Sequence, residues 1–299
     1  MKKVIFIILV LLLFPLNALA KVKVVTTLPI FASLANAVGG ERISTKSLAR
    51  ANQDPHFLPA KPAYAVALNR ANLLIHAGMD LEVGWLPAVL IQSRNPKIQF
   101  NAVGNVNASE GITALEVPSG VITRAMGDVH PLGNPHYYMD PRNGRIVAEN
   151  IFKHLVEVDP EGESYYQGRL AAFQNKLKQQ VQNWESRAAP LKGKPILTFH
   201  KTWTYLVNWL GLNVVGNVEP KPGIPPNAKH TDWLIKMIPQ NQVRALLMTD
   251  YYPRKVPDYI SQKTGIPLLV LGSETLSDSE QAFFDLFESI LSPLMEKVP

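Results

Sequence analysis

The sequence predicts an α/β protein of two lobes, each built on a parallel sheet, with one long helix joining the lobes and a cleft between them. In both halves of the chain, short β-branched runs alternate with helical stretches, a rhythm typical of βαβ units and parallel sheets. A much longer helical pattern separates the two halves. The hydrophobic fraction of 46% and the charged fraction of 18% are ordinary for a globular chain.

The first twenty residues, 1–20, are predicted to be a signal peptide. Lys2 and Lys3 precede the apolar run Val4–Leu16, and Ala18-Leu19-Ala20 fits the small-residue cleavage rule. The run is shorter than the roughly 20 residues that a membrane-spanning helix needs. We therefore expect cleavage after Ala20 and export to the periplasm, with an uncleaved N-terminal anchor as the alternative. The chain has no cysteine, so lipid attachment through a cysteine is excluded.

Residues 21–158 are expected to form the N-terminal lobe. Its predicted strands are Val22–Thr27, Ile43–Leu48, Leu73–Ala77 and Ile98–Ala102. Its predicted helices are Phe31–Val38, which Gly39-Gly40 stops, Pro62–Arg70, Leu81–Ser93 and one that starts near Arg142.

Residues 159–190 are expected to form the linking helix. Asp159 suits the N-cap position, Pro160 the first helical position, and Pro190 ends the pattern. Apolar residues recur at steps of three and four, at Leu170, Phe173, Leu177, Val181, Trp184 and Ala188. Some 29 helical residues, at about 1.5 Å per residue, make a rod roughly 43 Å long. This length favours a strut between lobes over an ordinary core helix.

Residues 191–299 repeat the alternation and are expected to form the C-terminal lobe. The predicted strands are Ile196–Phe199, Leu212–Val218, Ala245–Thr249 and Leu268–Leu271.

The amino-acid composition of the chain excludes several classes of function. Without cysteine there is no disulfide scaffold, no cysteine-based zinc finger and no cysteine nucleophile. The formal net charge of +6 includes the two lysines of the signal peptide, and no dense basic run remains. We therefore expect no nucleic-acid partner.

Three histidines and an aspartate occupy the positions where parallel sheets bind ligands, beyond the C-terminal ends of strands. His56 follows the second predicted strand, and His136 lies in a Pro/Gly-rich loop before a helix. His200 and Asp250 each directly follow a strand. Imidazole nitrogen and carboxylate oxygen are zinc ligands. The pattern therefore predicts a metal cleft between the lobes. The alternative is four unrelated loop residues, because their long separations form no local metal motif.

The other histidines are weaker candidates. His130 shares the loop of His136 and is a minor candidate for contact with the metal or its ligands. His76 lies in an apolar strand and is expected in the core or at the strand end. His154 is expected to be solvated, and His230 to lie near a helix start.

Several segments together resemble a known family. They are DPHFLPAKPAYAVALNRANLLIHAGMDLEVGWLP, GNPHYYMDPRN, TFHKTWTYL and VEPKPGIPP. Over about Val22–Leu291 the chain resembles the ZnuA/TroA-like substrate-binding proteins of zinc and manganese ABC importers. The resemblance implies two lobes on a rigid helix, one metal held by His56, His136 and His200, an ABC permease of the inner membrane as partner, and a monomer.

The sequence leaves the identity of the fourth metal ligand open. Asp250 is preferred, and Asp278 is the alternative because many relatives place an acidic ligand after the last strand. Water or Glu219 complete the options. The chain also lacks the long His-rich acidic loop of many zinc-specific relatives, so metal scavenging by such a loop is not expected.

These observations predict a periplasmic receptor that captures a divalent metal and delivers it to an ABC permease. A site rich in imidazole favours Zn²⁺ over Mn²⁺ as the bound cargo. One alternative is a zinc-dependent hydrolase with an open water position, although no strong general-base motif accompanies the ligands. Another is a surface adhesin in which the metal only stabilises the fold. No catalytic residue is expected.

Overall fold

The structure, a computed structural model, describes residues 20–298 except 121, 122, 124 and 125. The predicted signal peptide therefore lies outside the described residues, apart from Ala20. Within the part of the chain that is described, no helix combines the length and apolar character needed to cross a membrane.

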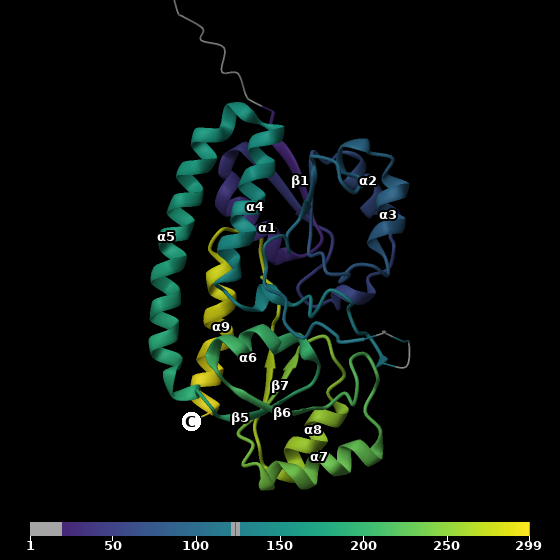
Figure 1. Ribbon diagram of the computed structural model, residues 1–299, viewed down its shortest axis with the longest axis vertical. Helices are drawn as coiled ribbons and strands as arrows, with labels where there is room; N and C mark the ends of the chain where they lie inside the picture. The colour runs from purple at the N-terminus through teal and green to yellow at the C-terminus, as the bar shows by residue number, and fades with distance from the viewer. Residues whose placement is uncertain (1–19, 121–122, 124–125, 299) are drawn as a thin grey trace, which may run out of the picture.

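Each lobe contains a four-stranded sheet, and every strand pair in both sheets is parallel. The N-terminal sheet has the order β2-β1-β3-β4, from Ile43–Ser47, Val22–Thr26, Leu73–His76 and Asn105–Asn107. The C-terminal sheet has the order β6-β5-β7-β8, from Asn213–Asn217, Pro195–Thr198, Leu246–Thr249 and Leu268–Leu271. The predicted class of two parallel α/β lobes is confirmed (Figure 1).

Helices cover both sheets. In the N-terminal lobe these are α1 (Pro29–Gly39), α2 (Pro62–Asn69), α3 (Leu86–Ser93) and α4 (Asn143–Val158). In the C-terminal lobe they are α6 (Thr204–Leu210), α7 (Ala228–Gln240), α8 (Lys255–Thr264) and α9 (Ala282–Lys297). The pair α2 and α3 lies on the opposite side of the N-terminal lobe from α1 and α4, and α7 and α8 lie at the far end of the C-terminal lobe (Figure 1).

The fourth strand of the N-terminal sheet lies further along the chain than predicted. The prediction of Ile98–Ala102 was wrong, because the segment before it forms a short 3₁₀ turn, Pro96–Ile98, and buries Ile98 as an anchor. The side chain of Asn95 accepts a hydrogen bond from Lys97 N at 3.1 Å and stabilises this turn. The chain pairs with β3 only after Gly104, at Asn105–Asn107.

Helix α3 begins five residues later than predicted, at Leu86 instead of Leu81. The cause is Glu82, a buried carboxylate that turns inward. Its Oε1 accepts hydrogen bonds from Ala77 N at 2.7 Å and Thr27 Oγ1 at 2.6 Å. These bonds tie the segment to the ends of β3 and β1, so the chain forms turns there before the helix starts.

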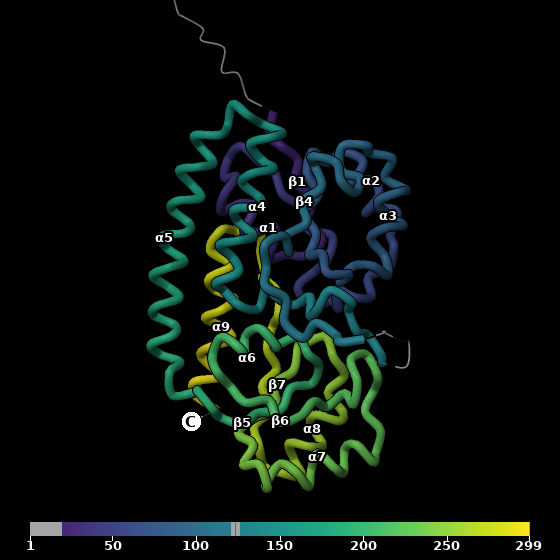
Figure 2. The backbone as a smooth tube through the Cα atoms, in the orientation of Figure 1, coloured from purple at the N-terminus to yellow at the C-terminus, as the bar shows by residue number. Residues whose placement is uncertain are grey.

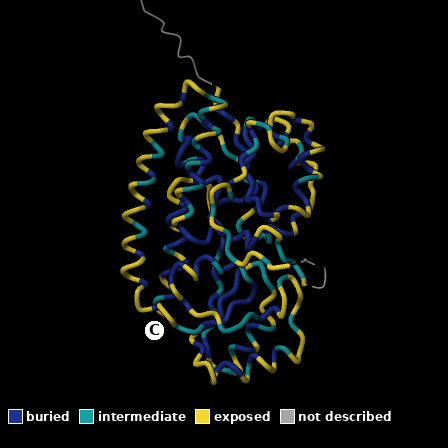
Figure 3. The backbone as a smooth tube through the Cα atoms, in the orientation of Figure 1, coloured by how far each residue is buried: buried dark blue, intermediate teal, exposed yellow. Residues whose placement is uncertain are grey.

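The long helix α5 (Glu163–Ala188) runs alongside both lobes, with α9 returning beside it (Figure 2). Asp159 does not cap it, because its carboxylate binds the Arg42 guanidinium at 2.9 and 2.7 Å. A 3₁₀ turn, Pro160–Gly162, comes first, and a second, Ala189–Leu191, follows the helix. Much of the outward face of α5 is exposed (Figure 3).

A single hydrophobic core connects the lobes. It includes the strands of the N-terminal sheet, the inner face of α5, α9 and one side of the C-terminal lobe. Trp184, near the C-terminal end of α5, belongs to this core, with ring centroids 5.6 Å from Phe287 and 6.3 Å from Trp209. A separate, smaller core lies under α7 and α8. Because the main core is continuous, the two lobes do not pack as independent bodies.

A buried carboxyl group also joins the lobes. Glu274 follows β8, and its Oε2 accepts a hydrogen bond from Ile30 N at the start of α1, at 3.1 Å. Its Oε1 is buried and has no hydrogen-bond partner among the residues that the structure describes. Burial raises the pKa of Glu274 to about 8. The side chain is therefore neutral in the folded protein at neutral pH.

The Glu274→Gln variant is expected to be more stable than the wild type, by an amount that grows with pH. Unfolded, Glu274 ionises above its usual pKa of about 4.5, so folding takes up a proton and wild-type stability falls between pH 4.5 and 8. Glutamine does not ionise. We expect a gain on the order of 2–4 kcal/mol at pH 8 and little at pH 5. Urea unfolding of the metal-free chain across this range measures it.

The matched control is Glu161→Gln, which removes an exposed carboxylate. It should leave the pH dependence of unfolding unchanged. A stability difference between Glu274→Gln and the wild type that stays constant from pH 5 to pH 8 would contradict the buried, protonated state of Glu274.

Candidate metal centre

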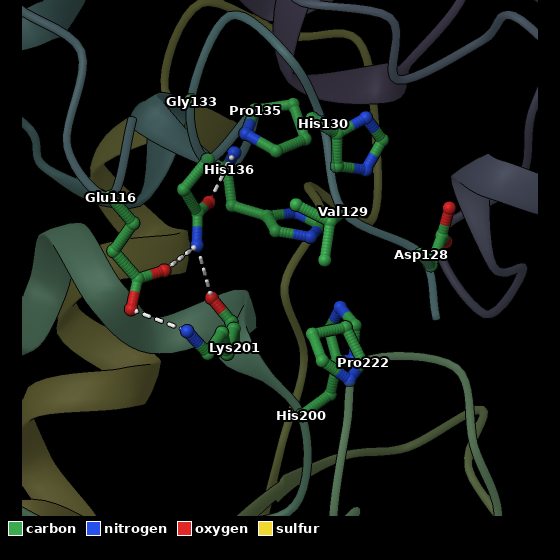
Figure 4. Close-up of a pocket in the computed structure, with 11 residues that line it drawn as sticks. Glu116, Asp128, Val129, His130, Gly133, Pro135, His136, His200, Lys201 and Pro222 are labelled. Atoms are coloured by element: carbon green, nitrogen blue, oxygen red, sulfur yellow. Dashed lines mark hydrogen bonds and ion pairs between the residues drawn. The ribbon is translucent and has the colours of Figure 1, made fainter. Parts of the chain in front are cut away.

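Three buried histidines converge where the two lobes meet. His56 lies in a 3₁₀ turn after β2, His136 at the start of the turn that leads into α4, and His200 directly after β5. They are 5%, 1% and 5% exposed. One ring nitrogen of each lies within 4.8 Å of those of the other two. The structure therefore brings together the three histidines that the sequence placed at strand ends and cleft loops (Figure 4 shows His136 and His200).

Side chains two residues earlier fix the backbone at two of these histidines. Asp54 Oδ1 accepts from His56 N at 3.0 Å, and Asn134 Oδ1 accepts from His136 N at 2.9 Å. A proline separates each pair and restricts the backbone further. These local turns hold both rings in place before any ligand binds.

Each of the three histidines uses its Nδ1 for a hydrogen bond to a neighbouring oxygen. The partners are Asp54 Oδ1 at 2.8 Å for His56, Tyr138 Oη at 3.1 Å for His136, and Glu219 Oε2 at 2.7 Å for His200. Such bonds fix the ring orientation and leave Nε2 as the ligand atom. The Nε2 atoms of His56 and His136 are buried and lack a hydrogen-bond partner in the described part of the chain. Buried polar atoms are normally paired, so these two point to a ligand.

The electrostatics of the cluster suit a cation. Burial, together with the neighbouring histidines, holds the pKa of His136 well below its usual value. Its ring is therefore neutral at physiological pH, and a neutral imidazole is the form that binds a metal ion.

The structure does not bring Asp250 to the histidines. It is exposed in the turn after β7 and belongs to neither of the two groups of potential ligand atoms found among the described residues. From the same turn, Tyr252 packs against His200, with ring centroids 5.7 Å apart. The residue directly after the strand is therefore exposed, and the aromatic ring two positions later packs against His200.

The two other acidic candidates also have different partners. Asp278 Oδ2 accepts from Thr45 Oγ1 of β2 at 3.0 Å. Glu219 is bound to the Nδ1 of His200, and its Oε2 also accepts from Gly223 N at 2.9 Å. Glu219 therefore orients a candidate ligand and shapes the loop after β6.

A carboxylate that the sequence analysis missed lies beside the cluster. Asp128 Oδ2 is 3.7 Å from the free Nε2 of His56. His56, Asp128 and His130 form a second group of potential ligand atoms within 4.8 Å of one another. The available signal was the segment Gly127-Asp128-Val129-His130, in which the acid lies two residues before a histidine already under consideration.

The remaining histidines lie elsewhere. His76 forms a hydrogen bond through Nε2 to Asn105 Oδ1 at 2.9 Å within the N-terminal lobe. His154 and His230 contact the backbone carbonyls of Val103 and Asn217. None of the three belongs to a group of potential ligand atoms in the described ranges.

Polar contacts beside the histidines hold the loop that precedes His136, in the N-terminal lobe, to the C-terminal lobe (Figure 4). Glu116 pairs with Lys201 at 2.9 Å. Asn134 Nδ2 donates to Glu116 Oε2 and to the carbonyl of Lys201, both at 2.9 Å. The loop that carries His136 is thus fixed directly beside His200.

Comparison with known proteins agrees with this fold and site. The profile of the family described as "Zinc-uptake complex component A periplasmic", ZnuA, matches residues 24–296. The manganese ABC transporter substrate-binding lipoprotein PsaA of Streptococcus pneumoniae is 25% identical over 93% of this chain and 88% of its own length. The iron-binding protein YfeA of Yersinia pestis is 26% identical over 84% of this chain and 76% of its own.

A crystal structure of ZnuA superposes with a TM-score of 0.79 at 22% identity, covering 93% of this chain and all of that one. The fold is therefore shared as well as the sequence pattern. The family profile matches nearly the whole described chain, and the relatives are binding proteins rather than enzymes. The chain belongs to the ZnuA family and is the metal-binding, substrate-binding component of an ABC transporter.

Proposed function

We propose that this chain captures Zn²⁺ as its cargo through His56, His136 and His200 and delivers it to an ABC permease. The observation that carries this proposal is the convergence of three buried imidazoles whose Nδ1 atoms are already engaged. Three neutral nitrogen ligands leave one position of a tetrahedral zinc ion for a further ligand.

Zinc is preferred over manganese because of the donor atoms. The relatives differ in this respect, since their names specify manganese, iron or zinc. Mn²⁺ favours carboxylate and water oxygens, and imidazole-rich sites bind Zn²⁺ more strongly. In this chain the three innermost donors are all nitrogen, and neither Asp250 nor Asp278 joins them.

The family supports the proposed setting. Substrate-binding proteins of ABC importers work with permease and ATPase components. The signal-like segment 1–20 supports export to the periplasm, with delivery to a permease in the inner membrane. PsaA is described as a lipoprotein, and the sequence of this chain contains no cysteine. We propose that the mature chain acts as a monomer in the periplasm.

Calorimetric titration of the metal-stripped chain tests the proposal. One Zn²⁺ should bind per chain, at least about 100-fold more tightly than Mn²⁺ in a competition titration at neutral pH, because all three inner donors are imidazoles. Equal or tighter binding of Mn²⁺ would identify a manganese receptor. The absence of a saturable site for either ion would overturn the metal function itself.

A further inference from the structure

The two groups of potential ligand atoms share one residue, His56. The inner group is His56, His136 and His200, and the outer group is His56, Asp128 and His130. The Nε2 of His56 is buried and free of hydrogen bonds within the described residues, and it lies 3.7 Å from Asp128 Oδ2. Tetrahedral zinc with bonds of about 2.0–2.1 Å has ligand atoms about 3.3 Å apart, so this pair is near coordinating distance.

The two groups cannot both hold an ion through the same atom. A neutral imidazole has one lone pair for a metal, and the Nδ1 of His56 is bound to Asp54. The five side chains make two sets of three ligand atoms, each set within 4.8 Å of one another, and the sets share His56. An ion bound to His56 can therefore be completed by His136 and His200 or by Asp128 and His130.

The two groups differ in depth. His136 and His200 are 1% and 5% exposed, whereas the side chain of Asp128 is 31% exposed and His130 is partly buried. Asp128 and His130 line the opening beside the buried histidines (Figure 4). An ion arriving from solvent reaches the outer group first.

The outer group is held across the boundary between the lobes. Asp128 N donates to the carbonyl of Pro222 in the C-terminal lobe at 2.8 Å. The neighbouring Gly127 has φ +83°, and a Cβ there would lie 2.2 Å from the Pro222 oxygen. Only glycine permits this close approach without displacement of the backbone. The segment 127–130 is thus fixed in position over the histidines.

We propose that Asp128 and His130, with His56, form an outer station that binds the incoming cation before it reaches the inner histidines. This inference rests on the proposed metal function. His56 stays bound to the ion while His136 and His200 replace Asp128 and His130 one at a time, so the ion never loses all its protein ligands. The negative charge of Asp128, which lines the opening, attracts the cation.

Stopped-flow mixing of Zn²⁺ with the metal-stripped chain tests this proposal. A residue on the path to a site, but absent from the final complex, changes the association and dissociation rates by the same factor. We therefore expect Asp128→Asn and His130→Ala each to slow both rates about tenfold and to change Kd less than threefold. The charge-matched control is Asp232→Asn, at an exposed position of α7, and the ring-matched control is His154→Ala, on α4. Neither variant should change the association or the dissociation rate.

Two outcomes would overturn the outer station. A larger Kd that arises from faster dissociation, with an unchanged association rate, would make Asp128 or His130 a ligand of the final complex. Unchanged rates and Kd would make both residues bystanders. In either case tight Zn²⁺ binding by the wild type would still support the proposed function, whereas loss of wild-type binding would remove the function and the station together.

Discussion

Replacing His136 with alanine is expected to weaken Zn²⁺ binding by about 100- to 1,000-fold. Four protein ligands together provide about 10–16 kcal/mol in structural zinc sites, so one ligand accounts for about 2.5–4 kcal/mol. His136 is the most deeply buried member of the inner group and belongs to that group alone. Its removal therefore leaves the outer group intact while the inner site loses a ligand. Competition titration with a chelator of known affinity measures the loss.

The control for this experiment is His76→Ala. His76 is also buried, but it binds Asn105 and belongs to neither group of potential ligands in the described residues. It should alter stability and leave Zn²⁺ affinity within about threefold of the wild type. Equal losses of affinity in both variants would mean that the first acts through unfolding, and undiminished binding by His136→Ala would remove His136 from the ligand set.

The convergence of His56 and His200 was predictable because both follow strands, whereas His136 was placed by its Pro/Gly-rich loop before a helix. Ligands collect at the C-terminal ends of parallel strands, and the alternation of strands and helices located those ends within a few residues. Asp250 shows the limit of that rule. A strand end fixes where a residue lies, but the turn that follows decides which way its side chain faces. Here the turn presents Tyr252 to His200 and leaves Asp250 exposed.

Asp128 shows a different limit. Its backbone donates a hydrogen bond to Pro222 in the other lobe, and this contact places it near His56. Asp128 and Pro222 are 94 positions apart in the sequence. No local pattern encodes such a contact. The sequence signals a Gly/Pro-rich loop with a histidine in it, but the path of the loop depends on Gly127 fitting against the other lobe.

The fold was predictable wherever hydrophobic periodicity was strong. Seven of the eight strands overlap their predicted ranges, because short runs of aliphatic and β-branched residues mark them. The eighth, Asn105–Asn107, has Val106 as its single aliphatic residue, between two asparagines, and so carries no such signal. The start of α3 was not predictable because Glu82 accepts hydrogen bonds from Ala77 N and Thr27 Oγ1 at the ends of β3 and β1, and these tertiary contacts override helix propensity.

Trp184→Ala is expected to lower the free energy of unfolding by about 3–5 kcal/mol. The side chain is 1% exposed and lies among Trp209, Phe284 and Phe287. Its Nε1 donates to Glu288 Oε2 at 2.9 Å, so the substitution also leaves that carboxylate with one fewer donor. The measurement is urea unfolding of the metal-free variant. Trp233→Ala is the matched control, because Trp233 is 51% exposed on α7 and its loss should cost less than about 1 kcal/mol.

The shape of that unfolding curve shows whether the two lobes unfold together. Trp184 lies where α5 and α9 join the inner face of the C-terminal lobe to the core of the N-terminal lobe. If this core is one cooperative unit, the variant should unfold in a single transition at lower urea, with the same slope as the wild type. Separate unfolding of the C-terminal lobe would instead show that α5 couples two independent bodies. Because the three histidines come from both lobes, a single transition would also mean that the packing of α5 keeps them together before the metal binds.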